Sequence, residues 1–248
     1  MNILLVGMLG KMGQSIINIS KEIDDITIVA GISKNIVNNK YDIPCYESFD
    51  EVIEDFDVII DFSNHLLTYD LINFSINKNK KLVIATTGQN DIEKKYINDA
   101  SQKIPIFFSS NYSIGITLLI DLAKKVSKTL KDSDIEIVET HHNQKLDAPS
   151  GTALSIAENL KTVNKNLNFV IGRNGNKKRE KNDIGINSIR RGNVVGIHEV
   201  IVSNEYETII LKHEAHTRFV FAKGAIEAAK FIFYKNKGLY NMNDMINQ

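Results

Sequence analysis

Side chains able to carry out acid–base chemistry and to bind anions are concentrated in one short stretch, residues 139–153. The stretch reads ETHHNQKLDAPSGTA and contains His141, His142, Lys145 and Asp147 ahead of a Ser-Gly-Thr turn. A lysine ammonium is a compact cation that can hold a carboxylate or give up a proton. Imidazole, ammonium and polar turn together predict a site for a small acidic substrate in a proton-coupled reaction.

This stretch lies where a strand is expected to end and a helix to begin. Residues 135–138 read as a buried strand, and apolar residues recur at helical spacing over 153–160. Ser150, Gly151 and Thr152 would open the helix, where unpaired backbone N–H groups and the helix dipole favour an anion. We therefore expect a carboxylate to bind at this helix start, with the glycine allowing close approach.

A purely structural interpretation of the same residues stays open. Ser150 would then only cap the helix, Asp147 would form a turn, and the histidines would be satisfied polar groups. His141 and His142 are adjacent, so on a strand they point to opposite faces and cannot easily ligate one metal. No His, Asp and Glu set has the spacing of zinc ligands, so we predict no metal site.

A glycine-rich turn follows the first predicted strand, residues 2–6. Residues 7–13 read GMLGKMG and precede a helical pattern. Glycines between a strand and a helix are typical of a dinucleotide-binding opening, because the backbone must come close to the pyrophosphate. The commoner G-x-G-x-x-G spacing is absent, since position 9 is Leu9, and a structural glycine turn is the alternative.

The end of the second predicted strand, residues 26–32, bears on the choice of nicotinamide cofactor. An NAD-specific site usually places Asp or Glu there for the ribose 2′-hydroxyl, whereas this chain has Ser33 and Lys34. A hydroxyl beside a cation suits the 2′-phosphate, and Lys11 could contribute from the first turn. The sequence therefore favours NADPH over NADH, although both lysines could equally be solvated.

Predicted strands and helices alternate through the first half of the chain. The strands are expected at 57–62, 81–86 and 105–109, and the helices at 66–76 and 91–100. This alternation indicates a Rossmann-like, doubly wound parallel sheet with right-handed crossovers. Ligands bind outside the carboxyl ends of such strands, where Phe62, Thr86, Gly88 and Asn111 fall. Turns favour several of these residue types in any case.

The pattern changes after residue 112. A long amphipathic helix is expected at 114–130, and a flexible surface loop at 172–185. Three strand-like segments without intervening helices follow at 186–190, 194–203 and 208–213. They predict a second, α+β domain with a mixed or antiparallel sheet.

The last helical pattern, 217–234, is expected to return to the first domain. We thus expect residues 1–112 with 219–248 to form a dinucleotide-binding domain and residues 113–218 a substrate-binding and oligomerisation domain. A sheet face that its own chain leaves uncovered often pairs with another subunit.

Composition limits the classes of function. The 248 residues include 30 basic and 30 acidic side chains, and the formal net charge of zero gives no global attraction to nucleic acid. One cysteine, Cys45, excludes an internal disulfide framework and fits the cytoplasm. The N-terminal apolar run is too short for a signal peptide, and no run approaches membrane-spanning length. We expect neither a nucleic-acid nor a membrane partner.

Taken together, these residues resemble the 4-hydroxy-tetrahydrodipicolinate reductases, a family long called dihydrodipicolinate reductases. The most specific match is the stretch 139–153. The supporting matches are residues 7–13, 61–63, 86–88, 111–115, Arg190, Gly192, Gly196, His198 and 218–224. The chain departs from the family pattern at Ala85, Asn193 and Ile197, which affects expected contacts at the cofactor site and the interface.

The resemblance implies a homotetramer that uses NADH or NADPH to reduce a cyclic imine dicarboxylate to tetrahydrodipicolinate, in the diaminopimelate route to lysine. It implies that His141 is the acid/base and Lys145 the proton donor. The implied carboxylate-binding residues are His142, Lys145, Ser150, Gly151 and Thr152. The implied cofactor-binding residues are Gly7, Gly10, Lys11, Met12, Gly13, Ser33, Lys34, Phe62, Thr86, Gly88 and Asn111.

Two other functions remain open. One is a different NAD(P)-dependent oxidoreductase of the same architecture, such as an amino-acid dehydrogenase, although the intact stretch 139–153 speaks against it. The other is a non-catalytic nucleotide-binding regulator, in which His141 and Lys145 would be idle. Oxidation of NADPH in the presence of fresh substrate would separate these possibilities.

Overall fold

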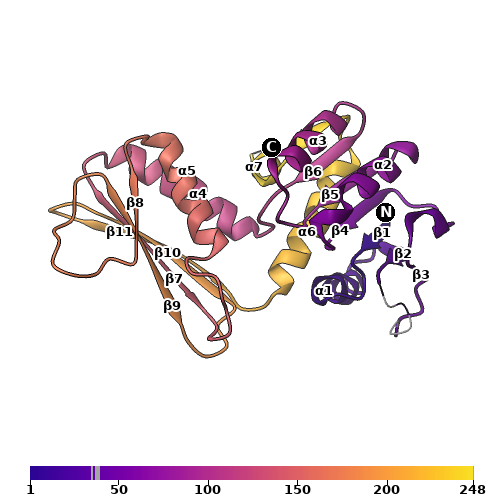
Figure 1. Ribbon diagram of the computed structural model, residues 1–248, viewed down its shortest axis with the longest axis horizontal. Coiled ribbons are helices and arrows are strands. Elements are labelled where there is room, and N and C mark those ends of the chain that lie inside the picture. Colours follow the sequence, from indigo (N-terminus) through magenta and orange to yellow (C-terminus); the bar gives the residue numbers. More distant parts are fainter. Residues whose placement is uncertain (35, 37–39, 248) are drawn as a thin grey trace. The chain divides into compact units, whose positions relative to one another are not determined.

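The computed structural model describes residues 1–34, 36 and 40–247, and the chain divides into two compact units (Figure 1). The first unit consists of Met1–Ser113 and Arg218–Gln248, and the second of Ile114–Thr217. The chain thus leaves the first unit after its sixth strand and returns to it with one long helix.

The first unit is built on a seven-stranded sheet in the order β12-β6-β5-β4-β1-β2-β3, with parallel neighbours throughout. Its strands are β1 (Asn2–Val6), β2 (Thr27–Ile32), β3 (Cys45–Tyr46), β4 (Val58–Asp61), β5 (Lys81–Ile84), β6 (Pro105–Phe108) and β12 (Gly238–Tyr240). Its helices are α1 (Lys11–Ser20), α2 (Thr68–Asn77), α3 (Asp91–Ala100), α6 (Phe219–Phe233) and α7 (Met242–Ile246), with 3-10 turns η2 (Phe49–Glu51) and η3 (His65–Leu67).

Both faces of this sheet are covered by helices. Successive side chains of a strand point to opposite faces, and in β1 this sends Ile3 and Leu5 into a core shared with α1 and α6. Leu4 and Val6 enter a second core, which contains residues of α2 and α3. The predicted Rossmann-like, doubly wound parallel sheet is therefore confirmed.

Helix α6 packs closely against Tyr112 at Gly224. A Cβ built on Gly224 would lie 1.7 Å from the carbonyl oxygen of Tyr112, so the approach requires glycine. Tyr112 is buried and donates its hydroxyl to the carbonyl oxygen of Ile84, 2.7 Å away. The C-terminal helix is in this way fixed against the segment that follows β6.

The second unit is a five-stranded mixed sheet in the order β11-β10-β7-β9-β8. The strands are β7 (Asp134–His141), β8 (Asn168–Ile171), β9 (Asp183–Arg190), β10 (Gly196–Ser203) and β11 (Thr208–Ala215). Helices α4 (Ile114–Thr129) and α5 (Gly151–Val163) cover one face, where Ile137, Ile186 and Val200 are fully buried (Figure 1). The predicted mixed sheet is confirmed.

The loop predicted for residues 172–185 is wrong at its end. Strand β9 begins at Asp183, because Ile184 is buried against Ile135 of β7 in a parallel pair. The surrounding Asn, Asp and Gly residues concealed that single apolar position. On the opposite sheet face, Ile189 and Ile210 are 44% and 58% exposed, so part of that face is apolar and open.

Candidate active site

Four polar side chains of the second unit occupy the helix-covered face of the sheet, where the strands end. Alternation from buried Ile137 places Glu139 and His141 on that face. The strand register sets His198 opposite Glu139 and Arg190 beside His141. Three strands thus bring Arg190 and His198, which are distant in the sequence, together with Glu139 and His141.

Glu139 is the centre of this cluster and is 0% exposed. Its carboxylate accepts hydrogen bonds from Nη1 and Nη2 of Arg190, at 2.8 and 2.7 Å, and from the Ser150 amide at 3.1 Å. Burial alone would raise the pKa of Glu139, but the hydrogen bonds from Arg190 and His141 outweigh it and lower the pKa from 4.5 to about 2. The carboxylate is therefore ionised at neutral pH.

The ionised carboxylate sets the tautomer of His141. Nδ1 of His141 lies 2.5 Å from Oε2 of Glu139, so Nδ1 carries the proton and donates it. Burial lowers the pKa of His141, and Glu139 offsets part of this effect. The imidazole is thus neutral at pH 7 with Nε2 as its remaining acceptor. Nε2 passes close to Gly196, where an added Cβ would approach it to 3.1 Å.

The start of helix α5 is capped by Ser150 and open to a ligand. Ser150 is the N-cap: its Oγ accepts from the amide of Ala153 at 3.2 Å and lies 3.1 Å from Nε2 of His198. Burial lowers the pKa of His198 to about 3, so this imidazole is neutral. The amides of Gly151 and Thr152 belong to the first turn and have no acceptor within the helix. A Cβ on Gly151 would meet nothing within 4 Å, so a ligand can approach these amides.

Lys145 lies in the loop between β7 and α5. Its Nζ is 2.7 Å from Oδ1 of Asp147, and its side chain is 20% exposed. Arg190 fixes the same loop by donating Nη2 to the carbonyl oxygen of Asp147 at 2.7 Å. The half-buried His142 accepts the amide of Lys145 with its carbonyl oxygen, at 3.2 Å. The stretch 139–153 is thus one hydrogen-bonded assembly, and the structural role expected for Ser150 coexists with an accessible helix start.

The glycine turn of the first unit is shaped by close backbone contacts. Gly7 has φ +83°, and a Cβ on it would lie 2.3 Å from the carbonyl oxygen of Phe62. A Cβ on Gly13 would lie 2.4 Å from the carbonyl oxygen of Gly7. Glycine at both positions lets α1 pack against β1 and leaves bare backbone at residues 7 and 13, which suits a dinucleotide pyrophosphate.

A cavity of about 420 Å³ adjoins this turn, at the carboxyl ends of β1, β2 and β4. Of the predicted cofactor residues, Gly7, Gly10, Ser33, Lys34 and Phe62 line it. A second cavity of about 240 Å³ shares Phe62 with the first and includes Thr86. The two cavities are neighbours, since Ser63 and Asn64 also line both.

The other predicted cofactor residues are not among those that line these two cavities. Lys11 is the exposed first residue of α1, Met12 is half-buried against the sheet core, and Gly13 is buried. Gly88 has φ +99°, where a Cβ would lie 3.4 Å from the His65 ring. Asn111 is bound to its own loop, through hydrogen bonds with the backbone of Ser113.

Several residues of these sites received no role from the sequence. Arg190 and His198 were matched to a family pattern, and Glu139 was read as part of a motif, but their convergence depends on strand register. Glu47 lines the larger cavity from the end of β3, a two-residue strand that periodicity cannot reveal. Asp61 is buried beside the smaller cavity, and burial raises its pKa to about 6 against the hydrogen bonds from Ser63 and Thr86.

Among residues 1–34, 36 and 40–247, no group of three or more His, Cys, Asp and Glu side chains could hold a metal ion. No helix there combines the length and apolar character needed to span a bilayer.

A parallel sheet with a glycine turn after its first strand and a cavity at its strand ends is typical of nicotinamide-dependent oxidoreductases. Family models narrow this class: the model of the N-terminus of dihydrodipicolinate reductase matches residues 1–112, and the model of its C-terminus matches residues 115–246. The chain belongs to the dihydrodipicolinate reductase family.

Relatives of this family match along the whole chain. The 4-hydroxy-tetrahydrodipicolinate reductase of Clostridium tetani is 46% identical, covering 99% of this chain and 96% of the relative. That of Buchnera aphidicola subsp. Cinara cedri is 42% identical, covering 98% and 96%. The resemblance inferred from the motifs is confirmed.

Solved structures share the fold. A dipicolinate-bound dihydrodipicolinate reductase from Paenisporosarcina sp. TG-14 superposes with a TM-score of 0.83 at 23% identity, covering 98% of each chain. An aspartate dehydrogenase from Thermotoga maritima gives a TM-score of 0.53 at 12% identity, covering 94% of this chain and 96% of its own. At these identities the likeness concerns architecture alone.

Proposed function

We propose that the protein is a 4-hydroxy-tetrahydrodipicolinate reductase, which uses NAD(P)H to reduce a cyclic imine dicarboxylate to tetrahydrodipicolinate. Family membership over the whole chain supports this activity. The observation that carries the proposal is the assembly at residues 139–153. There a Glu139-oriented His141, the Lys145 ammonium and an open helix start lie in one loop system.

The first unit has the features needed to hold the cofactor. The glycine turn presents bare backbone where a Cβ on Gly7 would collide with Phe62, and the adjoining cavity of about 420 Å³ is large enough for part of a dinucleotide. When bound, the reduced nicotinamide supplies a hydride to the imine. We assign dinucleotide binding to this unit, and substrate binding and oligomer contacts to the second unit.

The second unit offers matched partners for two substrate carboxylates. The helix start provides the amides of Gly151 and Thr152, and the ammonium of Lys145 provides a positive charge. Oγ of Ser150 already accepts the Ala153 amide, and His198 can donate its Nε2 proton to the same oxygen. The hydroxyl proton of Ser150 then remains available to a carboxylate, and His142 lies in the same loop.

The protein must also supply a proton. Hydride addition to a conjugated imine leaves negative charge on the ring. A general acid placed beside the ring can donate the proton that this charge requires. Lys145 is the donor in this proposal, and its ammonium also offsets the charge of the substrate. His141, neutral with Nε2 as its acceptor, serves as the acid/base that exchanges protons in the loop.

We further propose a preference for NADPH, a homotetramer and a cytoplasmic location. Ser33 and Lys34 line the cavity next to the glycine turn, where a hydroxyl and a cation suit a 2′-phosphate. The exposed Ile189 and Ile210 on the open face of the second sheet support contacts with another subunit. Light scattering on a sizing column measures the subunit number directly.

The experiment for the activity is a coupled assay. A synthase generates the unstable substrate in place, and the loss of reduced nicotinamide absorbance is followed with NADPH and with NADH. Turnover that depends on both substrate and protein supports the proposal. Oxidation with an amino-acid dehydrogenase substrate instead, or no oxidation at all, would assign the protein to one of the two other functions.

A further inference from the structure

Strands β2 and β3 end side by side at the cofactor cavity. They pair in parallel with Ile32 opposite Tyr46, and the amide of Ser33 donates to the carbonyl oxygen of Tyr46 at 2.9 Å. The next residue after Tyr46 is Glu47, which therefore leaves the sheet at the same edge as Ser33 and Lys34. A basic and an acidic residue thus follow the ends of two paired strands.

Glu47 lines the cavity of about 420 Å³ together with Gly7, Gly10, Ser33 and Lys34. Its backbone is held, because its amide and that of Ser48 donate to Oε2 of Glu51 at 3.1 and 3.2 Å. Its side chain is exposed. The capping of η2 thus fixes the backbone of Glu47 at the cavity wall.

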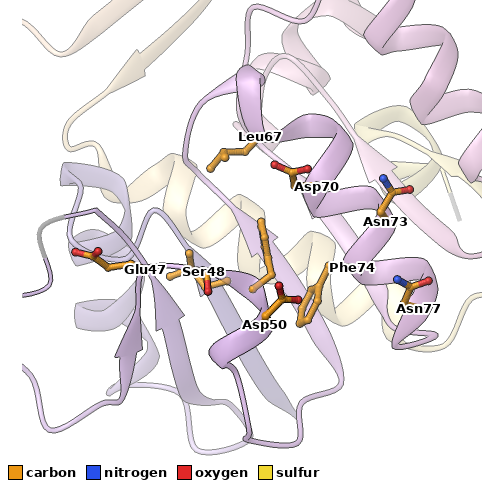
Figure 2. A pocket seen from close by; sticks show the side chains of 10 residues that line it. Glu47, Ser48, Asp50, Leu67, Asp70, Asn73, Phe74 and Asn77 are labelled. Atoms are coloured by element: carbon orange, nitrogen blue, oxygen red, sulfur yellow. The ribbon is translucent and has the colours of Figure 1, made fainter.

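Figure 2 shows a neighbouring cavity of about 370 Å³, which shares Glu47 with the first. Glu47 stands on the side opposite Asp70 and Asn77 of α2, with its carboxylate directed away from them. Asp50, in the same η2 segment, lines only the neighbouring cavity of the two. Of these three acidic residues, only Glu47 is among the residues that line the larger cavity.

The chemistry of the two nicotinamide cofactors differs at one position. The adenosine ribose lies at the end of the second strand in glycine-turn dinucleotide folds, and a carboxylate there accepts hydrogen bonds from its free hydroxyls. A 2′-phosphate carries nearly two negative charges, so a carboxylate beside it is repulsive while an ammonium is attractive. Lys34 and Glu47 would therefore have opposite effects on the preference for NADPH over NADH.

We propose that Glu47 is a specificity-determining residue of the cofactor site, which favours the ribose diol of NADH and limits the preference for NADPH that Ser33 and Lys34 create. The proposal rests on the proposed function, because it assigns the larger cavity to the adenosine half of the cofactor. In this proposal the balance between the two cofactors is set by two side chains from neighbouring strands.

The test is the variant Glu47→Gln, with both cofactors measured by turnover and by calorimetric titration. We expect the ratio of kcat/KM for NADPH to that for NADH to rise about tenfold, equivalent to ~1.4 kcal/mol. The ratio of dissociation constants should shift in the same direction. Because the effect is electrostatic and near the surface, it should shrink as salt is raised.

The matched control is Asp50→Asn, which removes a negative charge three residues away without altering the larger cavity. It should leave both ratios unchanged. An unchanged ratio in Glu47→Gln, with both cofactors still oxidised, would overturn the role of Glu47 and leave the proposed function intact. An equal shift in Asp50→Asn would also overturn it, since the effect would then be a general one of net charge. Failure of the unaltered protein to bind either cofactor would reject both proposals.

Discussion

The carboxylate of Glu139 accepts a hydrogen bond from Nδ1 of His141, 2.5 Å away, and Arg190 donates a hydrogen bond to each of its two oxygens. The imidazole is therefore fixed in one tautomer and one orientation by a charge with no exposed surface. A buried carboxylate with its hydrogen bonds satisfied is a rigid support, and its removal leaves an unpaired guanidinium.

Substitution Glu139→Gln tests this support. The amide is nearly isosteric but neutral, and its NH₂ group can turn toward Nδ1 and select the wrong tautomer. We expect turnover to fall on the order of 10²–10⁴-fold, the range for disabling an acid/base group, with cofactor affinity unchanged. Steady-state kinetics should show the lower turnover at every pH. The part of the pH profile that reports the titration of His141 should also shift. Full activity with an unaltered pH profile would mean that the contact is only structural.

The pKa of Glu139 also predicts how stability depends on pH. A carboxyl whose pKa falls from 4.5 in the unfolded chain to about 2 in the folded chain stabilises the fold fully above pH 4.5. This contribution is lost as the pH falls toward 2. The difference in free energy of unfolding between the unaltered protein and Glu139→Gln should therefore decrease by about 2 kcal/mol from pH 6 to pH 3. Urea unfolding at both pH values measures it, and a constant difference would contradict the assigned pKa.

Cofactor choice should respond to Lys34. Changing Lys34→Glu places a negative charge where the 2′-phosphate is expected and should weaken NADPH far more than NADH. A tenfold or larger change in the ratio of Michaelis constants is the expected order for reversing one charge near the surface. If both constants moved together, Lys34 would have no role at the 2′-phosphate.

The contact between Gly224 and Tyr112 predicts a stability change whose sign opposes helix propensity. Alanine in place of a helical glycine normally stabilises by up to about 1 kcal/mol. Here the added Cβ would lie 1.7 Å from a backbone oxygen, so Gly224→Ala should destabilise by roughly 1–3 kcal/mol. The exposed neighbour Lys223 provides the control, with Lys223→Ala expected within about 0.5 kcal/mol of the parent. Thermal unfolding shows whether the steric contact with Tyr112 or the helix propensity of alanine has the larger effect on stability. A stabilised Gly224→Ala would show that α6 is not tightly packed there.

Much of the fold could be predicted because its signals are local. Alternating apolar strands and helices predicted the parallel sheet, and glycines at residues 7–13 marked the turn at its first strand. Strands β3 and β12 have two and three residues, too few for a period to show. Ile184 was concealed by its polar neighbours, so the start of β9 was missed.

The candidate site was predictable only where its residues are neighbours in the sequence. His141, Lys145 and Ser150 lie in one stretch, and their residue types indicated acid–base chemistry. The roles of Arg190 and His198 arise from strand register, and that of Glu47 from the pairing of β3 with β2. Such long-range placement is set by packing, which no local pattern encodes.

Lys145 carries the central claim, that one ammonium both offsets the substrate charge and donates the proton. Lys145→Arg keeps the charge but hardly releases a proton, so it should retain much of the substrate affinity with low turnover. Lys145→Ala should lose both, since it removes the charge together with the donor.

The most direct measurement is therefore the turnover of Lys145→Ala in the coupled assay, combined with fluorescence titration of the cofactor on the same preparation. The account predicts a fall in kcat on the order of 10²–10⁴-fold with the cofactor dissociation constant unchanged. A parallel loss of cofactor binding, or turnover close to that of the unaltered protein, would contradict it.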